Sequence, residues 1–208
     1  MRRLLMVSAI ILAGLTLTTE SSADVPVYGY DLINTYPHDP AAFTQGLYYK
    51  NGYLYEGTGL YGKSSLRKVV PETGVVVKSR QLNSSYFGEG ITIRDTLIYQ
   101  ITWREESGFV YVEHQEFDLV DSFSYPTDGW GLTDDDTSLI MSDGSNRLYH
   151  LDLETFEHID TVTVTADGYP VTQINEMEMI RGKIYANILY SDLIAVIEPS
   201  SGVVEAWL

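Results

Sequence analysis

The sequence predicts an all-β protein with the β-propeller fold, on three observations. A short motif that ends in a [Gly/Glu]-[Leu/Ile/Met] step recurs along the chain, with copies 44, 41 and 45 residues apart. Each copy is followed by short apolar runs that turn residues separate, as expected for antiparallel strands. No stretch after Ala23 has helical periodicity over three turns. A repeat of roughly 40–50 residues built from short strands is typical of propellers and solenoids.

The repeats start near residues 43, 87, 129 and 174, and each should supply one blade of four short strands. Turn signals separate these strands, among them Asn51-Gly52, a hairpin signal, and Pro71-Glu72-Thr73-Gly74. A further strand is expected over 25–34, before the first repeat. The strands expected within the repeats are 43–49, 53–57, 65–70 and 75–81; 89–93, 96–103, 109–113 and 116–125; 131–134, 138–143, 147–152 and 159–163; and 175–180, 183–189, 193–197 and 203–207.

The N-terminus is interpreted as a signal peptide over residues 1–23. It has Arg2 and Arg3, then an apolar run over 4–15, then the small residues Ser21-Ser22-Ala23. This predicts an exported protein, secreted or periplasmic, whose single propeller domain covers residues 24–208. The alternative is an uncleaved membrane anchor.

The chain is acidic, with a formal net charge of −16, and it has no cysteine. Nucleic acids and anionic membranes are bound through Lys/Arg patches, so we expect neither as a partner, and no membrane after signal cleavage. A plain alternative explains the same charge, namely the soluble surface of a secreted protein. The four histidines lack the ligand spacing of a zinc site, and 134–136 is read as a solvated turn rather than a calcium loop.

Four side chains occupy the same position in the repeats, namely Gln45, Glu89, Trp130 and Asn175. If each copy opens the same strand of its blade, these side chains surround one central opening. A carboxylate, two amides and an indole around one mouth indicate a binding or catalytic site rather than a core.

The motifs resemble those of the plant-type glutaminyl-peptide cyclotransferase family, which plants and bacteria share. They run in order over nearly all of the chain after the signal peptide. The resemblance implies a five-bladed propeller that converts the N-terminal glutamine of a peptide to pyroglutamate and releases ammonia, with no metal or other cofactor. We also expect a monomer. The matching motifs are Phe43-Thr44-Gln45-Gly46-Leu47, Glu56-Gly57-Thr58-Gly59-Leu60-Tyr61-Gly62, Phe87-Gly88-Glu89-Gly90, Thr102-Trp103-Arg104, Gly129-Trp130-Gly131-Leu132, Ser142-Asp143-Gly144-Ser145 and Tyr185-Ala186-Asn187.

Glu89 is the predicted catalytic residue. Cyclisation requires the α-amine to lose a proton and the leaving amide nitrogen to gain one, and a single carboxyl group with a raised pKa can serve both steps. Phe87 offers an apolar wall on one side, and the flanking Gly88 and Gly90 permit close approach of a ligand. The plain alternative is an exposed glutamate at the start of a strand.

Substrate binding is assigned to two amides and four aromatic residues. Neutral amides can hydrogen-bond the substrate amide and its developing oxyanion, and an aromatic wall suits a glutamine side chain and an ammonium group. The alternatives are amides that only satisfy a turn and aromatic rings that only pack between blades. Trp207, at the end of an outer strand, is read as packing. The predicted binding residues are Gln45, Asn175, Trp103, Trp130, Phe43 and Phe87.

The sequence departs from the family pattern at two points. Leu189 follows Ala186-Asn187-Ile188, where the family carries a tryptophan, and the chain ends at Leu208. That end predicts an incomplete last blade, and the alternative is a propeller that closes with four blades. These departures leave open a second function, a non-catalytic propeller that serves as a binding or interaction module. A calcium-dependent propeller hydrolase is disfavoured, because the predicted site offers one acid among amides and indoles.

Overall fold

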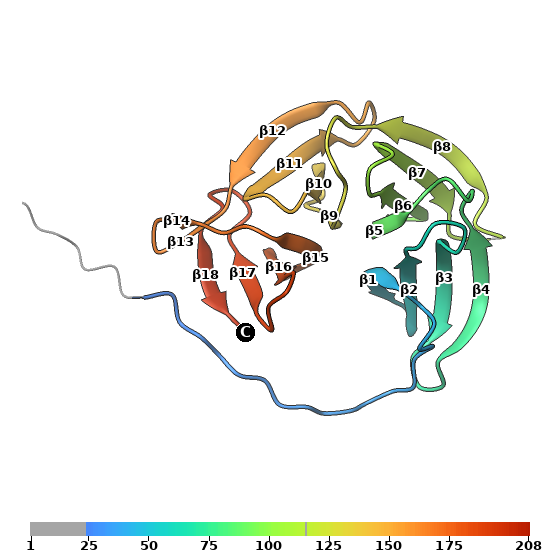
Figure 1. Ribbon diagram of the computed structural model, residues 1–208, viewed down its shortest axis with the longest axis horizontal. Helices are drawn as coiled ribbons and strands as arrows, with labels where there is room; N and C mark the ends of the chain where they lie inside the picture. Colours follow the sequence, from blue (N-terminus) through green and yellow to red (C-terminus); the bar gives the residue numbers. More distant parts are fainter. Residues whose placement is uncertain (1–23, 115) are drawn as a thin grey trace, which may run out of the picture.

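The computed structural model describes residues 24–114 and 116–208, and the predicted signal peptide lies outside them. The described chain is a β-propeller, in which four antiparallel sheets of four strands each are arranged around a central axis (Figure 1). The prediction of an all-β propeller is confirmed. No helix long enough and apolar enough to cross a membrane occurs among the described residues.

Each sheet is one blade whose strands follow one another from the axis outward. A two-stranded hairpin between blades 3 and 4, β13 (Thr165–Ala166) with β14 (Tyr169–Pro170), was not predicted from the sequence. Blade 1 consists of β1 (Thr44–Lys50), β2 (Tyr53–Thr58), β3 (Ser65–Val70) and β4 (Val75–Gln81); blade 2 of β5 (Gly88–Arg94), β6 (Leu97–Thr102), β7 (Ser107–Val112) and β8 (Leu119–Ser124); blade 3 of β9 (Leu132–Asp134), β10 (Ser138–Ser142), β11 (Arg147–Asp152) and β12 (His158–Thr163); and blade 4 of β15 (Ile174–Ile180), β16 (Lys183–Ile188), β17 (Ile194–Ile197) and β18 (Val204–Trp207).

The hydrophobic core lies between neighbouring blades, because the side chains of each pleated sheet project toward the faces on either side. Tyr55 and Ile91 belong to a buried cluster between blades 1 and 2. Tyr99 and Leu139 belong to one between blades 2 and 3. A third cluster joins blades 3 and 4. Among the described residues no such cluster joins blade 4 to blade 1.

The opening between blades 4 and 1 contains a cavity of about 450 Å³ instead. Its walls come from the innermost strand of blade 1 and from the first three strands of blade 4, and they are mainly apolar. Figure 1 shows the ends of the ring on either side of this opening, with β1 facing β15. Buried apolar packing therefore holds three of the blade junctions together. Within the described residues the junction between blades 4 and 1 lacks such packing.

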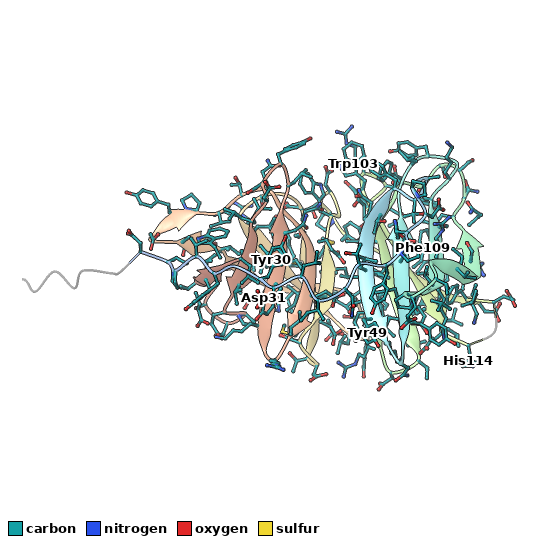
Figure 2. All side chains as sticks on the ribbon, turned by 90° about the horizontal axis from the view of Figure 1, so that it is seen from below. Tyr30, Asp31, Tyr49, Trp103, Phe109 and His114 are labelled. Carbon is teal, nitrogen blue, oxygen red and sulfur yellow. The ribbon has the colours of Figure 1, made fainter. Side chains whose placement is uncertain are left out.

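The strand expected over 25–34 is wrong. Only Val27 pairs, in an isolated parallel bridge with Trp207. The residues on either side of Val27 each form one backbone hydrogen bond with Trp207, which is partly buried against the core of blade 4. Residues 28–37, called the strap below, then cross the opening in an extended conformation, as Tyr30 and Asp31 show in Figure 2. They form no strand because no neighbouring strand lies beside them to share a hydrogen-bond ladder.

Candidate functional site

A pocket of about 450 Å³ lies at one end of the propeller and gathers all seven predicted site residues. Figure 2 shows Trp103 at this end, while Tyr49 and His114 lie toward the other. Leu189, noted above as a departure from the expected pattern, lines the pocket, and so do Gln173 and Tyr190, which the sequence did not single out. The predicted residues in its lining are Phe43, Gln45, Phe87, Glu89, Trp103, Trp130 and Asn175.

Irregularities at the start of the inner strands present three of these side chains to the pocket. The pairing of β1 with β2 shifts register between Thr44 and Gly46. The first two strands of blades 2 and 4 shift at the same place in their repeats, where Glu89 and Asn175 fall. A β-bulge leaves a residue outside the ladder and re-aims its side chain. The repeat position that Gln45, Glu89 and Asn175 share is thus the position that each bulge frees.

Glu89 is a buried carboxyl group, with 4% of its surface exposed. Burial raises its pKa to about 9, and the nearby charges of Glu105 and Asp128 act in the same direction. Gln45 opposes them, because its Nε2 donates a hydrogen bond of 2.9 Å to Oε1 of Glu89. A carboxyl group with this pKa keeps its proton at neutral pH and can both give and take a proton near that range.

An aromatic cluster forms one wall of the pocket around Phe87. The ring centroid of Phe87 lies 6.1 Å from that of Phe43, 5.5 Å from that of Tyr61 and 5.6 Å from that of Trp103, all edge-to-face. The guanidinium carbon of Arg104 lies 3.8 Å from the centroid of a Trp103 ring. All three rings therefore pack against Phe87, and of these four residues Phe43, Phe87 and Trp103 also line the pocket.

Glu105 fixes the backbone beside this wall. Its Oε2 accepts a hydrogen bond of 3.2 Å from the backbone N–H of Phe87, and its Oε1 accepts one of 2.8 Å from the hydroxyl of Tyr61. The sequence did not reveal this role, because Glu105 lies 18 residues from Phe87 along the chain.

Trp130 contributes a hydrogen-bond donor that no described residue accepts. Its indole Nε1 is shut off from solvent and has no partner within residues 24–114 and 116–208. A buried donor without a partner is costly and needs an explanation. Trp130 lines the pocket, so a ligand oxygen bound there would satisfy this donor once the indole ring turns toward it.

The described residues contain no group of three or more His, Cys, Asp or Glu side chains that could hold a metal ion. The acidic run 134–136 begins at the last residue of β9 and continues through the turn to β10, where Oδ1 of Asp135 accepts hydrogen bonds from the backbone N–H groups of Thr137 and Ser138. This agrees with its interpretation as a turn.

Comparison with known proteins points in one direction. The sequence profile of the glutamine cyclotransferase family matches residues 6–208. The chain is 41% identical, over 180 residues and 86% of its length, to a glutaminyl-peptide cyclotransferase of Arabidopsis thaliana, and the match covers 56% of that protein. The chain therefore spans little more than half of the relative's length.

Solved structures resemble the fold. The crystal structure of Myxococcus xanthus glutaminyl cyclase matches with a TM-score of 0.79 and 33% identity, over 85% of this chain and 75% of that one. The WD40 domain of Neurospora crassa Pan2 matches with a TM-score of 0.53 and 10% identity, over 81% of this chain and 50% of that one. The second likeness concerns the fold alone.

Proposed function

The chain belongs to the glutamine cyclotransferase family, and on that premise we propose that it is a glutaminyl-peptide cyclotransferase, an acyltransferase that needs no metal or other cofactor. Its substrates are peptides or proteins with an N-terminal glutamine. The product is the pyroglutamyl peptide, and ammonia leaves. The observation that carries this proposal is a buried carboxyl group, Glu89, with a pKa near 9 inside a pocket lined by amides and aromatic rings.

One carboxyl group is enough for both proton transfers of the reaction. The neutral α-amine attacks the side-chain amide carbon, the new C–N bond closes a five-membered ring, and the old C–N bond breaks. Glu89 gives its proton to the departing nitrogen and takes one from the attacking nitrogen, so it ends as it began. Burial favours this role, because it keeps the carboxyl protonated at neutral pH.

The remaining pocket residues are assigned to binding. The amides of Gln45 and Asn175 and the indole N–H of Trp130 are donors suited to a carbonyl oxygen that gains negative charge during attack. The rings of Phe43, Phe87 and Trp103 would enclose the methylene groups of the glutamine side chain, and an aromatic wall also suits an N-terminal ammonium.

The test is mass spectrometry of a peptide with N-terminal glutamine, incubated with the protein, with Glu89→Gln and with Glu178→Gln as a matched control on another inner strand. We expect loss of one ammonia with the wild type and the control, and none with Glu89→Gln while its circular dichroism stays unchanged. Turnover that survives in Glu89→Gln would refute the assignment.

We also propose a location and an oligomeric state for the enzyme. The protein is exported through the signal peptide at residues 1–23, is secreted or periplasmic, and works as a monomeric single domain over 24–208. Sequencing the N-terminus of the exported protein tests the cleavage after Ala23, and light scattering tests the monomer.

The five-bladed type of the family is a further part of the proposal. Two features support a fifth sheet between blades 4 and 1. One is the apolar cavity there, and the other is the strap, whose Tyr30 and Ile33 are each 84% exposed. An additional sheet would cover both. Protection of strap amides against hydrogen exchange would support such a sheet, and fast exchange in the active protein would oppose it.

One observation favours the second function, a propeller that binds glutaminyl peptides without converting them. Leu189 lines the pocket at the position where the family pattern has a tryptophan. In this case calorimetry would detect binding of the peptide while mass spectrometry would detect no ammonia loss.

A further inference from the structure

We propose that Glu176 is a positioning residue for the site: its carboxyl group joins β15 to β1 and thereby sets the spacing of Gln45 and Asn175. This inference rests on the proposed function for its kinetic test. It concerns a residue outside the site pocket, in the wall of the neighbouring cavity between blades 4 and 1.

The contact is a single hydrogen bond between the two ends of the ring. The backbone N–H of Leu47 donates to Oε1 of Glu176 across 2.7 Å, between residues 129 positions apart. Leu47 follows Gln45 by two residues on β1, and Glu176 directly follows Asn175 on β15. The bond therefore lies beside both amides of the site.

In the other three repeats the residue equivalent to Glu176 is a glycine. The backbone of the next blade lies so close to this glycine that an added Cβ would collide with it. The nearest backbone atom would be 2.6 Å from a Cβ on Gly46, 2.5 Å from one on Gly90 and 2.0 Å from one on Gly131. Only the fourth repeat has a long side chain here, Glu176, which spans a wider junction.

Within the described part of the chain, few other interactions hold this junction. No buried hydrophobic cluster of the described residues crosses it, and a cavity of about 450 Å³ occupies the space. Gln45 and Asn175 line both this cavity and the site pocket. The spacing of the two amides therefore depends strongly on the Glu176–Leu47 hydrogen bond. At the packed junctions no single contact has so large a share in the spacing of the residues.

The chemistry of the bond suggests a matched replacement. Burial raises the pKa of Glu176 well above its usual value, against the opposing effect of the Leu47 N–H. A carboxyl oxygen and a glutamine amide oxygen both accept a hydrogen bond from an N–H donor. Methionine has a similar length and lacks an oxygen acceptor.

The experiment compares Glu176→Met, Glu176→Gln and, as a control on the same strand, Glu178→Gln. We expect Glu176→Met to lower kcat/KM for a glutaminyl peptide by on the order of 10- to 100-fold, since small misplacements of binding groups cost about that much. Glu176→Gln and Glu178→Gln should stay close to the wild type. Hydrogen exchange at the Leu47 amide should accelerate in Glu176→Met alone. A core variant of blade 3, Leu148→Ala, controls for lower stability and should leave KM unchanged.

Three results would overturn the inference: a loss in Glu176→Gln as large as in Glu176→Met, an unchanged kcat/KM in Glu176→Met, or unchanged exchange at Leu47. If the wild type converts no glutaminyl peptide, the proposed function fails by itself. The inference is then decided by Leu47 exchange and by calorimetric binding of the same peptide, which Glu176→Met must weaken and Glu176→Gln must keep.

Discussion

The side chain of Gln45 donates a hydrogen bond of 2.9 Å to the buried carboxyl of Glu89, across 44 positions of sequence and from one blade to the next. The bond favours the ionised form of Glu89, whereas burial and the charges of Glu105 and Asp128 favour the protonated form. Burial prevails, and the pKa lies near 9. This balance predicts how activity responds to pH.

In the proposed reaction kcat/KM requires a neutral α-amine and a protonated Glu89. The α-amine of a peptide titrates at about 8, so activity should rise through that pH and fall again as Glu89 ionises near 9. The alkaline limb of the profile therefore reports the pKa of Glu89 in the free enzyme.

Gln45→Ala should move the alkaline limb to higher pH, because it removes the hydrogen bond that lowers the pKa of Glu89. It should also reduce kcat about 100-fold, as expected when a donor to the developing oxyanion is lost. The measurement is kcat/KM against pH with one glutaminyl peptide. An alkaline limb that moves to lower pH would contradict the balance described above.

Asp128→Asn should shift the alkaline limb in the opposite direction, to lower pH. The substitution removes a negative charge that raises the pKa of Glu89 and keeps the shape of the side chain. The same pH profile measures it, with Asp121→Asn on the exposed outer strand β8 as a control that should leave the limb in place. An equal shift in both variants would assign the effect to net charge rather than to proximity.

Trp130→Phe should lower kcat/KM for a glutaminyl peptide by about 2- to 10-fold, the range of one hydrogen bond of ordinary strength. The indole N–H has no partner among the described residues, so removing it leaves no buried acceptor unsatisfied in the free protein. Steady-state kinetics measure the change in kcat/KM, and urea unfolding of the same variant measures any change in stability. Trp207→Phe, away from the pocket, should leave kcat/KM unchanged.

Tyr125→Phe should lower the free energy of unfolding by about 1–3 kcal/mol, the usual cost of unsatisfied buried groups. The buried hydroxyl of Tyr125 donates to the carbonyl oxygen of Thr102 across 2.6 Å and accepts from the N–H of the same residue across 2.9 Å. Urea denaturation measures the change. Tyr169→Phe is the control, since Tyr169 is 76% exposed and should tolerate the loss of its hydroxyl.

The sequence by itself determined the blades and seven members of the pocket, but not Gln173 and Tyr190, which also line it. A strand in a propeller blade is specified by local alternation and by turn residues, and the repeat of one motif places Gln45, Glu89, Trp130 and Asn175 at one end of the axis. Equivalent positions in repeated units become neighbours around an axis, so no long-range information was needed to bring these side chains together.

Only the tertiary structure determined the environment of those side chains. The pKa of Glu89 depends on burial and on charges from Glu105 and Asp128, which are distant in sequence. Residues 25–34 have the alternation of a strand and form none, because a strand exists only beside a partner. The role inferred for Glu176 likewise depends on how far apart blades 4 and 1 stand. Each of these features depends on distances in space between residues that are far apart in the sequence. The periodicity of the sequence does not encode such distances.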